Sequence, residues 1–398
     1  MGFLNMKIKI NENFLSLEEN YLFSDINKKV NAYKEKNPDA DIIRLGIGDV
    51  TLPLPNIIVD AMIKASKEML SKDTFRGYPP EYGYDFLKKA IKDYYKRNGY
   101  DLDIESIFVS DGAKSDLGNI VDILGDNDIY IPNPVYPVYL DSNKMSGRRI
   151  HFIEGNESNN FKPLPTNLDN NPKIIYLCSP NNPTGATYSY NELKEWVDYA
   201  YKTESLIIYD AAYEAFIIDD SPRSIYEIPH AKEVAIEISS LSKMAGFTGV
   251  RCGYTIIPLE LKANNISLNK LWKRRQATKF NGVSYPVQRA TEAALSIEGV
   301  KASKENLDKY KENAVILSNL FDRKHIWYSG GKNSPYIWLK CPNNMKSFEF
   351  FDFLLDKANI VGTPGVGFGM FGEGYFRLTS FNTKENTIKA VERLEKIL

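Results

Sequence analysis

Residues 240–251 read Ser-Leu-Ser-Lys-Met-Ala-Gly-Phe-Thr-Gly-Val-Arg and follow the mostly apolar run 234–238. Lys243 therefore stands among small and hydroxyl residues, a setting that is unusual for a lysine meant for solvent. A lysine held in a pocket has a lowered pKa, so its amine can attack an aldehyde and form a Schiff base. Ser240, Ser242 and Arg251 supply two hydroxyls and a planar guanidinium, which are groups that hold a phosphate. The stretch predicts a site for a phosphate-bearing aldehyde, pyridoxal 5′-phosphate; the alternative is a surface lysine on an ordinary loop.

Length and composition indicate a globular protein with more than one domain. The chain has 398 residues, of which 43% are hydrophobic and 25% charged, and this length exceeds one ordinary core. Lys and Arg number 50 against 51 Asp and Glu, so the charge balance indicates neither a nucleic-acid nor a membrane surface. Three cysteines without a CxxC spacing and three scattered histidines predict no disulfide framework and no metal site. We expect a cytoplasmic protein, since neither a signal peptide nor a membrane-spanning run is recognisable in the sequence.

The middle of the chain alternates strands with helices. Continuous apolar strands in such an alternation are typical of a mostly parallel α/β sheet that is covered on both faces. After about Tyr285 a helical stretch, short strands and a final helix at 384–398 indicate a smaller α+β domain. We predict a large cofactor-binding domain at 51–285 and a small domain made of 1–50 together with 286–398. The strands expected in the large domain are 106–109, 128–131, 174–177, 206–210, 234–239 and 252–257.

Polar side chains follow five of the expected strands, where ligands of such sheets bind. Each has an ordinary structural interpretation when taken alone, as a helix cap, a turn or a buried aromatic. Together they supply what pyridoxal phosphate needs: a carboxylate for the pyridine nitrogen, partners for the 3-oxygen, an aromatic ring for stacking, phosphate donors and an amine. In that order the candidates are Asp210; Tyr213 and Asn182; Tyr136; Ala113, Lys114, Ser240, Ser242 and Arg251; and Lys243.

Three motifs make the chain resemble the class I/II aminotransferases over essentially its whole length. They are Ser-Pro-Asn-Asn-Pro-Thr-Gly at 179–185, Tyr-Asp-Ala-Ala-Tyr at 209–213, and Ser-Leu-Ser-Lys at 240–243 with Gly-Val-Arg-Cys-Gly-Tyr at 249–254. The resemblance implies a fold-type I pyridoxal-phosphate-dependent transferase, with a large, mostly parallel domain and a smaller α+β domain. It also implies that Arg377 binds the α-carboxylate of the substrate.

A narrower resemblance is to the LL-diaminopimelate aminotransferase branch of that family. It is carried by the segments 43–51, 75–78, 111–114, 134–139, 279–285, 335–340 and 362–365. It implies a homodimer with shared sites, in which Tyr78 and Asn281 reach the cofactor or substrate of the neighbouring subunit. Ser115, which stands where the family pattern has cysteine, joins the cofactor set. The implied substrate-binding residues are Tyr21, Gly48, Glu81, Lys114, Tyr136, Asn182, Asn281 and Arg377.

The expected reaction interconverts tetrahydrodipicolinate plus glutamate with LL-diaminopimelate plus 2-oxoglutarate in lysine biosynthesis. Diaminopimelate carries an ammonium and a carboxylate at its distal end, and Glu81 with Lys114 could pair one charge with each. Pro79 and Tyr82 depart from the family pattern around Glu81, so another substrate, such as aspartate or an aromatic amino acid, is the alternative. A pyridoxal-phosphate lyase and a non-catalytic protein of the same fold are further alternatives.

Overall fold

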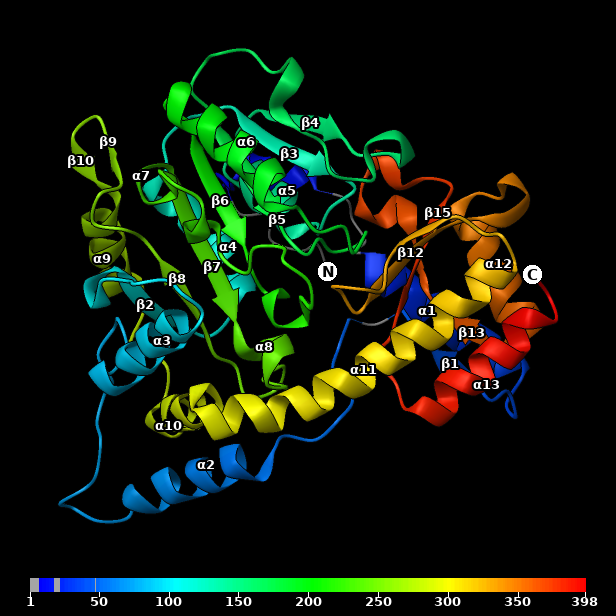
Figure 1. The fold of residues 1–398 in the computed structure, drawn as a ribbon, viewed down its shortest axis with the longest axis horizontal. Helices are drawn as coiled ribbons and strands as arrows, with labels where there is room; N and C mark the ends of the chain where they lie inside the picture. Colours follow the sequence, from blue (N-terminus) through cyan, green and yellow to red (C-terminus); the bar gives the residue numbers. More distant parts are fainter. Residues whose placement is uncertain (1–6, 18–21, 47) are drawn as a thin grey trace.

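The computed structural model describes residues 7–17, 22–46 and 48–398 (Figure 1). Its larger sheet has seven strands in the order β2-β8-β7-β6-β5-β3-β4. Six of these strands run in one direction and β8 runs in the opposite direction. This arrangement confirms the predicted mostly parallel α/β sheet. The strands are β2 (Ile107–Ser110), β3 (Ile129–Asn133), β4 (Ile150–Glu154), β5 (Ile174–Cys178), β6 (Leu206–Asp210), β7 (Ala235–Ser240) and β8 (Gly253–Ile256).

Two apolar cores cover the two faces of this sheet. Successive strand residues point to opposite faces, so Ile207 lies in one core and Ile208 in the other. Helices α3, α6 and α10 pack on the first face, and α4, α5 and α9 on the second. The helices of this part are α2 (Asn56–Glu68), α3 (Asp85–Arg97), α4 (Ala113–Asn119), α5 (Val138–Met145), α6 (Tyr190–Lys202), α7 (Ala231–Val234), α8 (Leu241–Met244), α9 (Leu268–Lys279) and α10 (Tyr285–Leu295).

A smaller antiparallel sheet with the order β11-β12-β15-β14 lies at the other end of the molecule (Figure 1). Beside this sheet β1 and β13 pair in parallel. The hairpin formed by β9 and β10 lies away from it, next to α9 (Figure 1). The strands are β1 (Ile43–Arg44), β9 (Lys262–Ala263), β10 (Ile266–Ser267), β11 (Tyr328–Gly330), β12 (Tyr336–Lys340), β13 (Ile360–Val361), β14 (Thr363–Pro364) and β15 (Tyr375–Thr379). The remaining α-helices are α1 (Leu22–Lys36), α11 (Ile297–Arg323), α12 (Ser347–Ala358) and α13 (Lys384–Glu395).

The N-terminal segment packs with the C-terminal part of the chain. Val30 of α1 and Leu45 after β1 share an apolar cluster with Leu354 of α12 and Leu394 of α13. Ala290 of α10, which lies beyond the expected boundary at residue 286, belongs to the core of the large sheet. Figure 1 shows α11 running from α10 to the smaller sheet. We therefore propose that the domains divide within α11.

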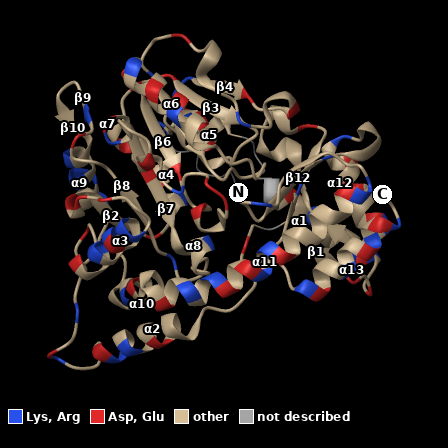
Figure 2. Ribbon diagram, in the orientation of Figure 1, with Lys and Arg blue, Asp and Glu red and all other residues tan. Residues whose placement is uncertain are grey.

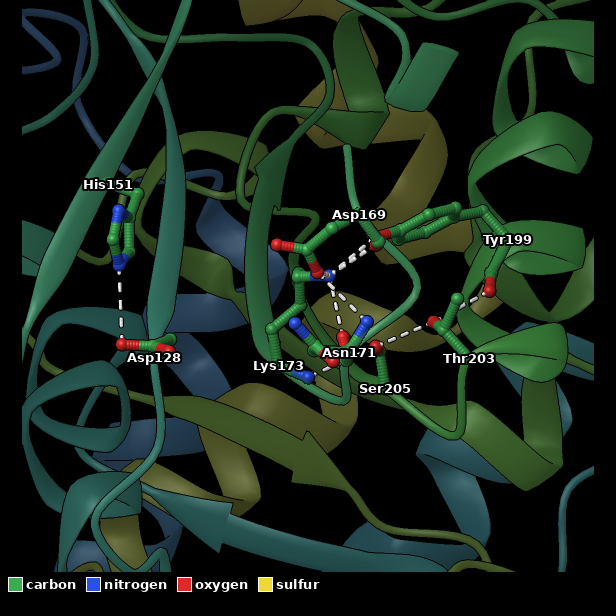
Figure 3. Close-up of polar contacts among 8 residues, drawn as sticks. All are labelled: Asp128, His151, Asp169, Asn171, Lys173, Tyr199, Thr203 and Ser205. Carbon is green, nitrogen blue, oxygen red and sulfur yellow. Dashed lines mark hydrogen bonds and ion pairs between the residues drawn. The ribbon is translucent and has the colours of Figure 1, made fainter. Parts of the chain in front are cut away.

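The amino end of β5 is held by a buried lysine (Figure 3). The ammonium of Lys173 donates to the carbonyl oxygens of Asp169 (2.7 Å) and Asn171 (2.6 Å), to Oδ1 of Asp169 (2.9 Å) and to the hydroxyl of Tyr199 (2.6 Å). Only 1% of the Lys173 side chain is exposed, so these oxygens replace its hydration. This cluster fixes the chain entering β5 at the end of the strand opposite to Cys178.

The surface carries charges of both signs. Figure 2 shows Lys and Arg interspersed with Asp and Glu along the outer helices, including α11. No helix in the described ranges has the length and apolar character needed to cross a membrane. No cluster of three or more His, Cys, Asp or Glu suited to a metal ion occurs among the same residues.

Candidate active site

A cavity of about 370 Å³ lies at the carboxyl ends of β5, β6 and β7. The parallel register puts Cys178, the last residue of β5, beside Asp210, the last residue of β6. Residues from the smaller sheet complete the wall. Twelve residues predicted from the sequence line this one cavity: Gly48, Ala113, Lys114, Tyr136, Asn182, Asp210, Tyr213, Ser240, Ser242, Lys243, Arg251 and Arg377.

Lys243 lies in α8, the short helix that directly follows β7. Its ammonium donates to the backbone carbonyl of Gly48, which brings the N-terminal segment to the site. Burial lowers the pKa of Lys243 to about 8; the cations of Arg377 and Arg251 act in the same direction and Asp49 opposes them. A fraction of the amine is therefore neutral near pH 8, which a nucleophile or a base requires.

Asp210 forms the buried floor of the cavity. Its Oδ1 accepts from the amide of Ala212 at 2.9 Å, and its Oδ2 accepts from the hydroxyl of Tyr139 at 2.6 Å. Burial raises the pKa of Asp210, while the two hydrogen bonds oppose that rise because they favour the carboxylate. The carboxyl group is thus held in one orientation by two donors.

Tyr213 follows β6 by three residues and is buried beside the cavity. Its hydroxyl lies 2.6 Å from the hydroxyl of Tyr336, which comes from β12 of the smaller sheet. Tyr136 lies in the loop between β3 and α5, with its ring edge-to-face against Tyr139 at 6.3 Å between centroids. Aromatic residues from both sheets therefore surround the cavity.

The corner beside α4 is rich in hydrogen-bond donors. The hydroxyls of Ser240 and Ser242 lie 2.8 Å apart, and a guanidinium nitrogen of Arg251 lies 3.4 Å from Ser242 Oγ. Arg251 has φ of 72°, a conformation that costs energy for a residue with a Cβ and persists only where the surroundings enforce it. Gly112 has φ of 139°, and a Cβ at this position would collide with the Arg251 guanidinium.

This corner and the floor fit the pyridoxal phosphate expected from the sequence. Gly112 leaves room for the Arg251 guanidinium, and the serines, Arg251 and the amides of the first turn of α4 are suited to a phosphate. A buried carboxylate and an amine complete the set of groups that the cofactor needs. The residues present therefore match both ends of the cofactor.

Arg377 of β15 is almost fully buried, with 1% of its surface exposed. Its guanidinium donates to Oδ1 of Asn182 and to the carbonyl of Gly46, each at 2.6 Å. The rings of Tyr336 and Phe368 flank the same guanidinium, with centroids at 4.4 and 4.7 Å. These contacts hold a planar fork at the cavity wall, as recognition of a carboxylate requires.

The remaining predicted residues that the structure describes do not line this cavity. Ser115, one position further along α4, lines a neighbouring pocket of about 630 Å³, and its expected place beside the cofactor stays a prediction. Tyr78 is 87% exposed, Asn281 is exposed, and Glu81 is half-buried on the same loop as Tyr78. Tyr21 lies outside the described residues.

The segments that carry Tyr78 and Asn281 lie side by side, although they are about 200 positions apart in the sequence. A Cβ on Gly282 would lie 2.6 Å from the carbonyl oxygen of Pro80 and 2.9 Å from Pro79 Cγ. The loop with Tyr78 extends from the body of the molecule between α2 and α3 (Figure 1). Both predicted intersubunit residues thus occupy one exposed region of the surface.

Several cavity residues were not singled out from the sequence. Tyr139 and Tyr336 stand inside motifs that carry the family resemblance, but nothing local assigns them to the site. Their partners, Asp210 and Tyr213, are 71 and 123 positions away. The other additions are Asp49, Leu117, Cys178, Ala212 and Thr248.

Comparison with known proteins gives a family and close relatives. The family model described as aminotransferase class I and II matches residues 40–394. An LL-diaminopimelate aminotransferase from Lachnospira eligens is 52% identical over 402 residues, which cover 98% of this chain and 100% of the relative. One from Prochlorococcus marinus is 52% identical over 409 residues, with the same coverage.

A solved structure has a closely similar fold. The L,L-diaminopimelate aminotransferase from Chlamydomonas reinhardtii superimposes with a TM-score of 0.93 at 41% sequence identity. The match covers 98% of this chain and 99% of that one. The similarity therefore extends over both sheets and is not restricted to the cavity.

Proposed function

Because the chain belongs to the class I and II aminotransferase family, we propose that it transfers an amino group from LL-diaminopimelate to 2-oxoglutarate and, in reverse, from glutamate to tetrahydrodipicolinate. It is a pyridoxal-phosphate-dependent aminotransferase, and its fold is that of the fold-type I enzymes. The observation that carries the proposed substrate is 52% identity, over the full length, to enzymes of that specificity. The reaction would serve lysine biosynthesis, with tetrahydrodipicolinate and 2-oxoglutarate as the corresponding acceptors.

Pyridoxal phosphate, when bound, supplies an electron sink that makes the α-proton of an amino acid removable. Asp210 would hold a proton on the pyridine nitrogen, since the amide of Ala212 and the hydroxyl of Tyr139 favour its carboxylate form and orient it. Tyr213 and Asn182 would donate to the 3-oxygen, and Tyr136 would cover the ring face. Ser240, Ser242, Arg251 and the amides of Ala113 and Lys114 would hold the phosphate.

Lys243 would attach the cofactor and then move the α-proton. Burial lowers the pKa of its amine to about 8, so Nζ can accept a proton near neutral pH and return it. Arg377, fixed by Asn182 and Gly46, would bind the α-carboxylate and so orient the Cα–H bond toward Nζ. Turnover then requires the three residues Lys243, Asp210 and Arg377 around one cavity, an arrangement that argues against a non-catalytic protein.

Substrate choice would depend on the distal end of the amino acid, because Arg377 can bind any α-carboxylate. Lys114 lines the cavity, and Glu81 stands on the loop that also carries Tyr78. Glu81 of one subunit could pair with the distal ammonium of diaminopimelate, which glutamate lacks. Tyr21 and Gly48 complete the proposed substrate set.

We further propose a homodimer with shared sites and a cytoplasmic location. Tyr78 and Asn281 are exposed on adjoining segments, as residues that reach a neighbouring subunit would be. Leu70 and Phe75 on the same loop are 88% and 59% exposed, which adds apolar surface that association could bury. The cysteines are all free thiols, as expected in a reducing compartment.

The experiment that tests the substrate is a comparison of kcat/KM for LL-diaminopimelate, aspartate and phenylalanine as amino donors to 2-oxoglutarate. LL-diaminopimelate should be strongly preferred. Glu81→Gln should lose about ten- to a hundredfold in kcat/KM for LL-diaminopimelate, as for a charge-assisted hydrogen bond, and spare glutamate in the reverse direction. Preference for aspartate or phenylalanine would contradict the proposal, and equal losses on both substrates would assign Glu81 to loop structure.

A further inference from the structure

Tyr336 links the two sheets at the edge of the cavity. It is the first residue of β12, only 1% of its surface is exposed, and its neighbours include Tyr213 and Phe381. Its hydroxyl lies 2.6 Å from that of Tyr213, and the two rings meet edge-to-face with centroids 5.2 Å apart. Tyr213 therefore has a buried hydrogen-bond partner that the sequence alone does not assign to it.

Tyr336 also contacts two other parts of the site. The guanidinium of Arg377 lies over its ring at 4.4 Å from the centroid. A Cβ on Gly48 would lie 2.5 Å from the Tyr336 hydroxyl, so the glycine at this position makes room for that hydroxyl. The Tyr336 side chain thus contacts Tyr213, the Arg377 proposed for the α-carboxylate, and Gly48, whose carbonyl accepts a hydrogen bond from Lys243.

The order of donors in the tyrosine pair follows from the charges around it. Each hydroxyl has one proton, and either can donate in the isolated pair. When the Tyr213 hydroxyl donates its hydrogen bond to an anionic oxygen in the cavity, the Tyr213 oxygen is free to accept a hydrogen bond from Tyr336. The Arg377 cation over the Tyr336 ring makes the Tyr336 hydroxyl more acidic and therefore the better donor. Burial raises the pKa of Tyr336, and Arg377 opposes that rise.

We propose that Tyr336 is a positioning residue that acts through Tyr213, because its hydroxyl donates to Tyr213 and strengthens the bond from Tyr213 to the 3-oxygen of the cofactor. Hydrogen bonds in a chain polarise one another, and this effect is larger in a buried site than in water. The inference rests on the proposed function, since it takes pyridoxal phosphate as the group that accepts from Tyr213. Tyr336 itself need not touch the cofactor.

The test is a pH titration of the visible absorbance of the loaded enzyme, which reports the proton shared between the Lys243 nitrogen and the 3-oxygen. A hydrogen bond to the 3-oxygen favours its anionic form and therefore lowers the pH midpoint. Tyr336→Phe keeps the ring beside Arg377 and removes only the hydroxyl. Its midpoint should rise by about 0.3–1 pH unit, given the usual net value of one hydrogen bond. KM for the amino donor should stay within about twofold, because the Arg377 contact remains.

Two comparisons separate positioning from stability. Tyr188→Phe removes another buried hydroxyl, which donates to the carbonyl of Pro163 at 3.0 Å and lies outside the cavity; it should lower the melting temperature and leave the midpoint in place. In a double-mutant cycle, adding Tyr336→Phe to Tyr213→Phe should cause no further shift, because Tyr336 acts through the missing hydroxyl.

The outcomes are distinct. A parent enzyme without visible absorbance or transamination would overturn the proposed function and this inference with it. A parent that shows both, with a Tyr336→Phe midpoint equal to the parent's, would overturn the inference alone. A full shift that persists in the Tyr213→Phe background would also overturn it, because Tyr336 would then act independently of Tyr213.

Discussion

The hydroxyl of Tyr139 lies 2.6 Å from Oδ2 of Asp210, and both side chains are buried under the cavity. Tyr139 belongs to α5 on one face of the large sheet, while Asp210 ends β6 inside it. The bond fixes the carboxylate that faces the cofactor site and opposes the rise of its pKa that burial causes. Tyr139 therefore acts on the cofactor site through Asp210 as well as lining the cavity.

Tyr139→Phe should shift the acid limb of the pH–kcat profile to higher pH. Without the Tyr139 hydroxyl the pKa of Asp210 rises further. Asp210 is then protonated at a higher pH, and kcat falls earlier as the pH is lowered. A hydrogen bond to a charged group is worth about 1.5–3 kcal/mol, which corresponds to about one to two pH units. Tyr176→Phe is the matched control, because its buried ring stacks on Tyr139 at 5.3 Å. An acid limb that moves equally in both variants would assign the effect to packing.

Uptake of pyridoxal phosphate by the cofactor-free protein should follow the neutral amine of Lys243. Burial lowers the pKa of this lysine to about 8, so the rate of borohydride-trappable uptake should rise with pH through a midpoint near 8. Asp49 raises the pKa, so Asp49→Asn should move the midpoint to lower pH. Lys243→Ala should bind the cofactor reversibly, trap none of it and lose turnover by orders of magnitude. A midpoint near 10.5, the ordinary value for lysine, would show that the amine is not desolvated.

Mixing two inactive variants should restore activity if the sites are shared. Tyr78→Phe and Lys243→Ala proteins can reassort into hybrid dimers, in which one site carries both lesions and the other carries neither. Activity above that of either parent is expected, with hybrid formation verified by native mass spectrometry. If verified hybrids show no recovery, Tyr78 acts within its own subunit.

Lys173→Met should destabilise the protein without changing kcat, because Lys173 directly precedes β5, whose other end, at Cys178, lines the cavity. The substitution leaves buried oxygens without their donor, which should lower the free energy of unfolding by about 1–3 kcal/mol. Lys202→Met, an exposed lysine at the end of α6, is the control. Denaturant unfolding measures both variants.

The pH dependence of this stabilisation has a definite sign. Burial alone would lower the pKa of Lys173, but the hydrogen bonds with Tyr199 and Asp169 outweigh it and raise the pKa. The stabilisation should be fully present below the ordinary lysine pKa of about 10.4 and should fade as pH rises through the raised value. A difference between parent and Lys173→Met that disappears already at neutral pH would contradict this account.

Local sequence patterns predicted the strands that consist mostly of apolar residues. The β-branched run 206–210 is β6 with the expected bounds, and the strand expected at 174–177 is β5 except for its last residue, Cys178. Helices α5 and α12 were not among the expected elements, although the buried residues of α12 recur at helical spacing, at 347, 350, 351, 354, 355 and 358. The domain boundary expected at 286 stays a prediction, because the side of a helix that packs on a distant core, as α10 does, is not marked in its own sequence.

The candidate site was predicted where motifs follow strands. Parallel strands bring their carboxyl ends together, which explains why Asn182, Asp210 and Lys243 meet at one cavity. Hydrogen bonds between distant segments, such as that between Tyr213 and Tyr336, have no local sequence signature and are recognised only in the three-dimensional structure. The expected roles of Tyr78, Glu81 and Asn281 depend on a second subunit and remain predictions.

The most direct test of the central claim is the fate of the nitrogen in ¹⁵N-labelled LL-diaminopimelate. The loaded enzyme should take up one labelled amino group per subunit in the absence of a keto acid, and addition of 2-oxoglutarate should release the label as glutamate. Lys243→Ala should transfer none at a comparable rate. Release of the label as free ammonia would indicate a lyase, and no transfer from LL-diaminopimelate alongside efficient transfer from aspartate would contradict the account.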